Sequence, residues 1–248
     1  MSRERVLILG ATSAIASEVA QIYAGRGARL HLVGRNPEKL SRVAARLSVS
    51  DATTEIADFE QLSRNEGVVD RAIATLDGLD TVLIAHGYLG DQLASERAFD
   101  EADHILRANF TSVVSLLIPL ANHLEKVGGG RLAVITSVAG DRGRPRNYTY
   151  GAAKGALNVY LQGVRSRLFS AGVHVTTLKL GPVDTPMTTT HKKHLLFGKP
   201  PTVAAQIVAA TDAGKSEAYV PAFWGAIMPI VKNTPEPLFQ AMPFLSRR

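Results

Sequence analysis

The stretch VLILGATSAIA, residues 6–16, decides the fold. Residues 6–9 are all apolar, and a short run of this kind predicts a strand that is buried on both faces. Gly10 permits a tight turn, and the pattern over 14–25 predicts a helix that ends at Gly25-Arg26-Gly27. A buried strand that turns directly into a helix is the first half of a parallel strand-helix-strand unit.

The same alternation continues almost to the end of the chain. Further strands are predicted at 30–33, 53–57, 81–85, 132–136, 173–180 and 217–220, and further helices at 37–47, 62–76, 98–124, 150–171 and 202–213, with a possible kink at Pro119. Right-handed crossovers then give a Rossmann-like, doubly wound α/β fold with a parallel sheet in three layers. We expect a single domain, with residues 1–222 as its dinucleotide-binding catalytic part and 223–248 as an apolar C-terminal extension.

Composition narrows the classes of protein. The chain has 248 residues, of which 46% are hydrophobic and 20% charged, which favours one domain with a large core over disorder. The absence of cysteine excludes disulfides and thiolate metal sites and fits a cytoplasmic location. No apolar run reaches the roughly 18 to 20 residues of a spanning helix, the N-terminus lacks a signal-peptide layout, and no metal site is predicted.

The net charge of +6 allows two interpretations, a solvated basic surface or a face that binds polyanions. The basic residues are scattered and are not interleaved with aromatic residues. We therefore expect no nucleic-acid partner.

The first turn is a candidate nucleotide site. In a doubly wound sheet, ligands bind beyond the carboxyl ends of the strands, and the backbone N–H groups that open a helix can hold a pyrophosphate. Ala14 and Ala16 stand where a glycine-rich loop would have glycines. The turn after Gly10 therefore also fits an ordinary connection between a strand and a helix.

The end of the second predicted strand, Gly34-Arg35-Asn36, contains no acidic residue that would bind the ribose 2′-hydroxyl of NAD. A guanidinium at Arg35 would instead grip a 2′-phosphate with two hydrogen bonds. The sequence therefore predicts NADP(H) over NAD(H). The alternative is a surface arginine that caps a turn.

One tyrosine is paired with a lysine. On a helix, Tyr150 and Lys154 lie four residues apart on the same face, whereas Tyr148 and Tyr160 do not share that spacing with the lysine. A nearby ammonium is expected to lower the pKa of a phenol, which can then protonate a carbonyl oxygen or deprotonate an alcohol. This spacing is frequent by chance, but Ser137 ends a predicted strand and lies 13 residues before Tyr150, where its hydroxyl can hold the substrate oxygen.

At this point the chain resembles the short-chain dehydrogenase/reductase family, over residues 5–222. Thr136-Ser137, Tyr150 and Lys154 stand at the family's spacing, and the resemblance implies that Ser137 positions the substrate oxygen, Tyr150 is the general acid/base, and Lys154 tunes its pKa and binds ribose. Asn109 matches the family's helix asparagine, which anchors a water and completes a proton relay.

The resemblance also implies the cofactor contacts. Asp58 matches an acid that bonds the adenine amino group, and residues 180–185 resemble the segment that faces the nicotinamide carboxamide. The complete expected set is Gly10, Thr12, Ser13, Ala14, Ile15, Arg35, Asn36, Asp58, Phe59, Ala85, His86, Gly87, Tyr150, Lys154, Gly181, Val183 and Thr185. Leu180 replaces a family proline. His86 departs from the usual pattern of two asparagines, an alanine and a glycine, and is either a harmless substitution or a substrate contact.

The resemblance implies an oxidoreductase that transfers a hydride between a nicotinamide and a small carbonyl or alcohol substrate, assembled as a homodimer or homotetramer. The alternative is a non-catalytic dinucleotide sensor or scaffold on the same fold. The presence of all four groups, Asn109, Ser137, Tyr150 and Lys154, argues against it, because a sensor needs only some of them.

The last part of the chain leaves several interpretations open. The basic loop 188–194 fits an anionic substrate or simple solvation, and it belongs to the long irregular segment 185–201, which is a candidate lid. The apolar stretch 222–231 fits packing against the body or a sister subunit, peripheral membrane contact with Lys232, Arg247 and Arg248 near headgroups, or a pocket wall. Residues 179–188 and 219–239 show a weaker resemblance to the family branch that reduces polyprenylphosphoryl ketosugars, which implies a lipid-linked anionic sugar.

Overall fold

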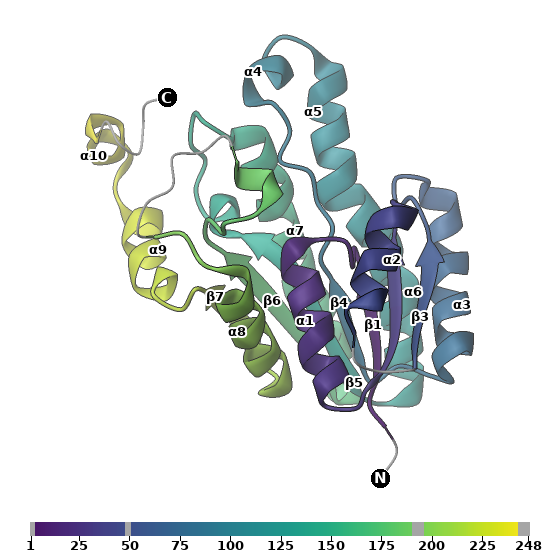
Figure 1. Cartoon of the computed structure of the whole chain (residues 1–248). Helices are drawn as coiled ribbons and strands as arrows, with labels where there is room; N and C mark the ends of the chain where they lie inside the picture. Colours follow the sequence, from purple (N-terminus) through teal and green to yellow (C-terminus); the bar gives the residue numbers. More distant parts are fainter. Residues whose placement is uncertain (1–2, 48–50, 190–195, 243–248) are drawn as a thin grey trace.

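The computed structural model describes residues 3–47, 51–189 and 196–242. In these ranges a seven-stranded parallel sheet has the order β3-β2-β1-β4-β5-β6-β7 (Figure 1). The strands are β1 (Arg5–Leu9), β2 (Arg29–Gly34), β3 (Ala52–Ile56), β4 (Thr81–Ile84), β5 (Gly130–Ser137), β6 (Val173–Leu180) and β7 (Glu217–Val220). The helices are α1 (Ala14–Gly25), α2 (Pro37–Ala45), α3 (Asn65–Leu76), α4 (Gln92–Ser95), α5 (Phe99–Leu106), α6 (Ser112–Val127), α7 (Tyr148–Leu168), α8 (Pro200–Asp212), α9 (Trp224–Asn233) and α10 (Glu236–Ala241).

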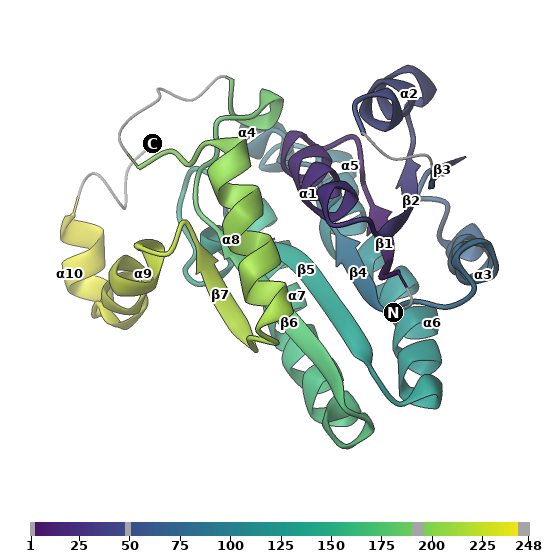
Figure 2. The ribbon, with the colours of Figure 1, turned by 60° about the horizontal axis from the view of Figure 1, so that its bottom comes forward.

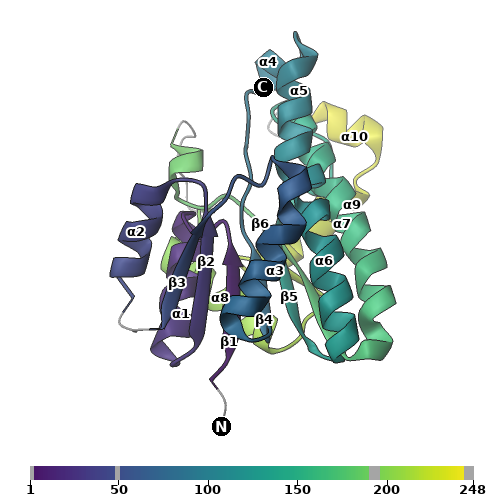
Figure 3. The same ribbon diagram turned by 90° about the vertical axis from the view of Figure 1, so that its right-hand side faces the viewer.

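Helices cover both faces of the sheet. Buried side chains of α1, α2 and α8 pack on one face, and those of α3, α6 and α7 pack on the other (Figures 2 and 3). The central strands β1 and β4 are almost entirely apolar, as expected where both faces of a strand are covered. The predicted three-layered, doubly wound α/β fold is confirmed.

The strand order creates the place for a ligand. β1 pairs with β2 on one side and with β4 on the other, so the connections run to opposite sides of β1. Leu9 lies beside both Val33 and Ile84, which brings the turns that follow these three strands to the same level. A crevice outside the carboxyl ends of the strands, where the order reverses, is the usual ligand site of such sheets.

The long helix predicted over 98–124 has its irregular turn upstream of Pro119, where a kink was expected. Its hydrogen bonding changes in a π-helical turn, η2 (Arg107–Thr111), which lies upstream of Pro119, and Pro119 itself lies inside α6. Asn109 occupies this turn and its side chain donates to the carbonyl oxygen of Ile105 at 2.8 Å. Single π-turns inside α-helices are frequent at functional sites.

This helical run bears on the expectation that no segment spans a membrane. By length and composition, Phe99–Val127 is apolar enough to cross a bilayer, although no spanning segment was expected from the sequence. Half of its most apolar window is buried in the domain, where α6 packs on the sheet. A core helix of an α/β domain passes the same test, so the segment is weak support for a membrane span.

The C-terminal extension forms two helices that the sequence did not predict, α9 and α10. Trp224 and Met228 pack against Val138, and the guanidinium of Arg142 donates to the carbonyl oxygens of Lys232 at 3.1 Å and Thr234 at 2.5 Å. The described part of the extension therefore packs against its own domain. Arg247, Arg248 and most of the basic loop lie outside the described residues, and membrane contact stays a prediction.

Candidate active site

The turn after β1 approaches the segment that follows β4 too closely for Gly10 to carry a side chain. Gly10 has a φ of +87°, and a Cβ added to it would lie 2.6 Å from the amide nitrogen of His86. The side chain of Ser13, which precedes α1, makes no capping hydrogen bond, so it leaves the first N–H groups of α1 open at the carboxyl ends of the strands. Ala16 is fully buried in the core beneath the sheet, so its methyl group takes no space from a ligand. This turn fits the pyrophosphate of a dinucleotide.

The adenine end of the expected site lies beyond β2 and β3. Arg35 follows β2 with a largely exposed side chain, and Asn36 caps α2 by accepting the backbone N–H of Lys39 at 2.7 Å. Asp58 is exposed and accepts the backbone N–H of Glu60 at 3.1 Å. Phe59 is buried, and its ring centroid lies 4.7 Å from that of His86.

His86 is held as a neutral imidazole. The hydroxyl of Ser112 donates to the carbonyl oxygen of Ala108 at 3.0 Å, so it accepts from Nε2–H of His86 at 2.9 Å. Burial lowers the pKa of His86 to about 3, and the charges of Lys154 and Arg35 add to this effect. The remaining ring nitrogen, Nδ1, is a buried acceptor with no partner in the described part of the chain.

Asn109 connects η2 to the turn after β4. Its amide nitrogen donates to the carbonyl oxygen of Tyr88 at 2.6 Å, and its amide oxygen accepts the N–H of Tyr88 at 3.1 Å. A Cβ added to Gly87 would lie 2.9 Å from this amide oxygen and 3.5 Å from Nζ of Lys154. The side chains of the asparagine and the lysine therefore both approach the space beside this glycine.

The predicted acid/base group is assembled at the ends of β5 and α7. The hydroxyl group of Ser137 lies close enough to the phenol of Tyr150 to act against the rise of its pKa through hydrogen bonding. Nζ of Lys154 lies 5.8 Å from the ring centroid of Tyr150 and donates to the carbonyl oxygen of Ile135 at 3.3 Å. Ser137, Tyr150 and Lys154 thus lie together, and Asn109 approaches Lys154 beside Gly87, while their roles stay predictions.

The expected direction of the tyrosine pKa is wrong for this structure. Burial raises the pKa of Tyr150 to about 12, with only the hydrogen bond to Ser137 acting in the opposite direction. Burial also lowers the pKa of Lys154 to about 8. Desolvation disfavours the charged form of each group, and here it outweighs the attraction between ammonium and phenolate.

Two glycines, Gly140 and Gly151, allow α7 to lie against the turn that carries Ser137. A Cβ added to Gly140 would lie 2.7 Å from the backbone of Lys154 and Gly155, and one added to Gly151 would lie 2.7 Å from the carbonyl oxygen of Ala139. The two backbones are therefore in direct contact. This contact fixes the distance between Ser137 and the side chains on α7.

We expect Gly140→Ala to push these backbones apart and to lower the unfolding free energy by about 1 to 3 kcal/mol, the usual effect of overpacking. Urea denaturation measures this change. Gly143→Ala in the same loop is the control, because a Cβ there meets nothing within 4 Å. Equal unfolding free energies for the two variants would contradict the prediction.

The segment after β6 meets the C-terminal extension. A Cβ added to Gly181 would collide with the indole nitrogen of Trp224, so the indole lies directly over this glycine. Val183 is buried and pairs with Gly198, while Thr185 caps the short helix η5 (Pro186–Thr188) together with Thr188. The sequence analysis did not place Trp224 at the site. One signal was present, because Trp224 belongs to the apolar stretch 222–231, for which a pocket wall was one of the interpretations.

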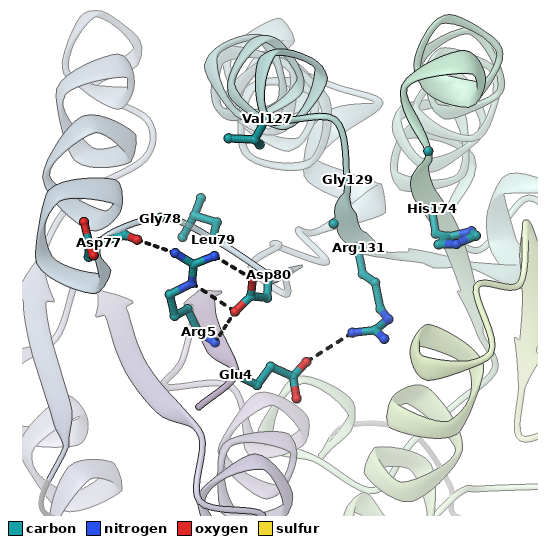
Figure 4. A pocket seen from close by; sticks show the side chains of 12 residues that line it. Glu4, Arg5, Asp77, Gly78, Leu79, Asp80, Val127, Gly129, Arg131 and His174 are labelled. Carbon is teal, nitrogen blue, oxygen red and sulfur yellow. Dashed lines mark hydrogen bonds and ion pairs between the residues drawn. The ribbon is translucent and has the colours of Figure 1, made fainter. Parts of the chain in front are cut away.

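A hollow of about 820 Å³ lies at the opposite end of the sheet, where β1, β4, β5 and β6 begin (Figure 4). Four of its charged groups form two ion pairs, Arg5 with Asp80 at 2.7 Å and Arg131 with Glu4 at 3.3 Å, and Asp77 also lines it. These pairs join the starts of neighbouring strands. In the described ranges, no group of three or more His, Asp or Glu side chains is arranged to hold a metal ion.

Comparison with known proteins assigns the family. The family model for short chain dehydrogenases matches residues 4–195. An uncharacterized oxidoreductase of Streptomyces coelicolor is 31% identical over 240 residues, which cover 96% of this chain and 95% of the relative. An uncharacterized oxidoreductase of Mycobacterium tuberculosis is 32% identical over 245 residues, covering 98% of this chain and 94% of the relative.

Solved structures agree on the fold. The crystal structure of levodione reductase superposes with a TM-score of 0.80 at 22% identity, over 88% of this chain and 95% of that one. A short-chain dehydrogenase/reductase from Mycobacterium ulcerans gives a TM-score of 0.76 at 20% identity, over 88% and 89% of the two chains. The chain belongs to the short-chain dehydrogenase/reductase family of oxidoreductases, whose cofactor is a nicotinamide dinucleotide.

Proposed function

We propose that this oxidoreductase uses NADP(H) and transfers a hydride between the nicotinamide and the carbonyl or alcohol carbon of a small substrate, with Tyr150 as general acid/base. The observation that carries the proposal is the placement of the Ser137 hydroxyl beside the phenol of Tyr150, with the ammonium of Lys154 5.8 Å from the tyrosine ring. A dinucleotide sensor has no need for a phenol, a hydroxyl and a buried ammonium at one point.

In the proposed mechanism, a bound nicotinamide supplies or accepts the hydride. Ser137 orients the substrate oxygen beside Tyr150, and Tyr150 gives its proton to that oxygen as the carbonyl is reduced. A pKa of about 12 keeps Tyr150 protonated at neutral pH, which suits the reductive direction. The positive charge of Lys154 stabilises the phenolate that remains after proton transfer. Asn109 would anchor the water through which the proton of Tyr150 is restored.

The residues of the crevice would hold the cofactor at three places. The turn after Gly10 and the first N–H groups of α1 would take the pyrophosphate. Lys154 would bind ribose hydroxyls, and Arg35 would take the 2′-phosphate. The side chain of Arg35 is 70% exposed, which leaves room at its guanidinium for the bidentate arrangement that a phosphate favours.

We expect Arg35→Ala to weaken binding of NADP⁺ by about tenfold while NAD⁺ binding changes by less than about twofold, because a charged hydrogen-bonded pair is lost only for the phosphorylated cofactor. Isothermal titration calorimetry measures both dissociation constants. Wild-type protein that binds the two cofactors equally would refute the NADP preference.

The substrate is best found by following NADPH oxidation against a panel of aldehydes, ketones and ketosugars. Consumption of NADPH with at least one of them is the expected result. Tight binding of NADPH without turnover on any compound of the panel would favour the sensor alternative. The panel includes phosphorylated ketosugars, since the basic loop and the weaker resemblance both favour an anionic sugar.

The proposed assembly is a homodimer or homotetramer through the long helices. Apolar side chains of α5, α6 and α7 point to solvent in the single chain, namely those of Phe99, Ile118 and Val159. Light scattering coupled to size-exclusion chromatography gives the mass, and a monomer at micromolar concentration would contradict this part of the proposal.

A further inference from the structure

An acidic side chain, Glu60, lies beside Arg35 at the end of β2, although the segment Gly34-Arg35-Asn36 itself contains no acidic residue. The carboxylate of Glu60, from the turn after β3, is 3.7 Å from Nη1 of Arg35 at the end of β2. Its side chain is 23% exposed, whereas that of Arg35 is 70% exposed. The end of β2 therefore presents an ion pair in place of an isolated cation.

The structure holds Glu60 in this position from two sides. Nε2 of His104 on α5 lies 3.2 Å from the Glu60 carboxylate, and the His104 ring stacks on Tyr88 with centroids 4.4 Å apart. The backbone N–H of Glu60 donates to the carboxylate of Asp58 at 3.1 Å. The carboxylate is thus anchored, and the exposed guanidinium is the partner that is free to turn toward a ligand.

We infer that Glu60 sets the cofactor preference of this site, acting against a 2′-phosphate and in favour of a ribose 2′-hydroxyl. A phosphate bound by Arg35 must replace the carboxylate as its partner and then lies close to a like charge. A carboxylate only accepts hydrogen bonds, so it can receive one from a 2′-hydroxyl but none from an ionised phosphate. The inference rests on the proposed role of Arg35 as the 2′-phosphate ligand.

Recognition of the ribose 2′ group is therefore shared by residues that follow two neighbouring strands, Arg35 after β2 and Glu60 after β3. In many dinucleotide sites, the acid that binds the 2′-hydroxyl follows the second strand. Here that place holds Arg35, and the acid arrives from the neighbouring strand end instead. The preference for NADP(H) is then smaller than the guanidinium alone would give.

The test is the change in dissociation constants for NADP⁺ and NAD⁺ in Glu60→Gln, measured by isothermal titration calorimetry. We expect NADP⁺ to bind about five- to tenfold more tightly, because a competing partner and a like charge are removed together. NAD⁺ binding should stay constant or weaken. The ratio of the two constants therefore shifts at least about fivefold toward NADP⁺.

Glu18→Gln is a matched control. Glu18 is 22% exposed and lies 3.5 Å from Arg46, which is 60% exposed, so the control removes the same charge from a similar ion pair away from the ends of β2 and β3. It should leave the ratio of the two constants unchanged. In an Arg35→Ala background, the gain of NADP⁺ affinity from Glu60→Gln should become smaller, since the competition for the guanidinium is gone.

The outcomes separate this inference from the proposed function. If Arg35→Ala weakens NADP⁺ but Glu60→Gln leaves the ratio unchanged, the inference alone is overturned. The same holds if Glu18→Gln shifts the ratio as much as Glu60→Gln does. If Arg35→Ala leaves NADP⁺ affinity unchanged, Arg35 is no phosphate ligand, and both the cofactor preference and the inference are overturned.

Discussion

Replacing Tyr150 with phenylalanine is expected to lower the rate of carbonyl reduction by about a thousandfold, within the range that a general acid contributes. The substitution removes one oxygen atom, whose described hydrogen-bond partner is Ser137, and Ser137 keeps its contact with the carbonyl oxygen of Leu180 at 3.3 Å. The fold and the cofactor crevice should therefore be unaffected. Single-turnover kinetics with NADPH and a substrate from the panel measures the chemical step, and calorimetry measures NADP⁺ binding.

Tyr148→Phe is the control for this experiment. Tyr148 lies two residues earlier on α7 and is largely exposed, so its hydroxyl should contribute nothing to the rate. A Tyr150→Phe enzyme that retained near-normal turnover would remove the acid/base role of this residue. A loss of NADP⁺ affinity equal to the loss of rate would point to a binding role instead.

Lys154→Met is expected to abolish most activity and yet to stabilise the protein at neutral pH. Lys154 is 2% exposed, and burial lowers its pKa from 10.5 to about 8. The folded state therefore carries a penalty of about 3 kcal/mol for holding the ammonium at pH 7. Loss of the hydrogen bond to Ile135 offsets about 1 kcal/mol of this. The net expected gain in unfolding free energy is about 2 kcal/mol.

The pH dependence of this gain identifies its cause. Between the folded pKa of about 8 and the unfolded value of 10.5, the unfolded chain binds more protons, so the stability of the wild type rises with pH. The advantage of Lys154→Met is then complete below about pH 8 and absent near pH 10.5. Urea denaturation at pH 7 and pH 10 measures it, with exposed Lys126→Met as the control. A variant that is less stable than the wild type at both pH values would contradict this account.

The strands and the turns that follow them could be predicted from the sequence because both depend on residues that are close together in the chain. A fully apolar run followed by Gly10 predicts a buried strand and a tight turn, and both are found. The spacing of Tyr150 and Lys154 predicts one helix face. Their approach to Ser137 follows from the parallel sheet, in which the carboxyl ends of the strands share one edge.

Two features of the site depend on contacts that no local pattern encodes. Glu60 and Arg35 are 25 positions apart, and only the parallel pairing of β2 with β3 brings the turns that follow them together. The direction of the Tyr150 pKa depends on burial, which the spacing of two residues on a helix does not reveal. Pairwise attraction was considered in the sequence interpretation, whereas desolvation decides the result.

The C-terminal helices were missed for a different reason. Residues 222–231 are nearly all apolar, so they lack the alternation of polar and apolar positions that marks an amphipathic helix. Their partner surface includes Val138 and Arg142, which lie more than 80 residues earlier in the chain. A segment of this kind takes its structure from the surface on which it packs.

The indole over Gly181 gives the protein a built-in optical probe. Trp224 is the single tryptophan of the chain, so all indole emission comes from one position, beside the segment expected to face the nicotinamide. Reduced nicotinamide absorbs where tryptophan emits, and its arrival at that segment would quench the fluorescence by energy transfer. Unmodified enzyme can thus show occupancy of the crevice, and any loosening of the terminal helices, in real time and without a label.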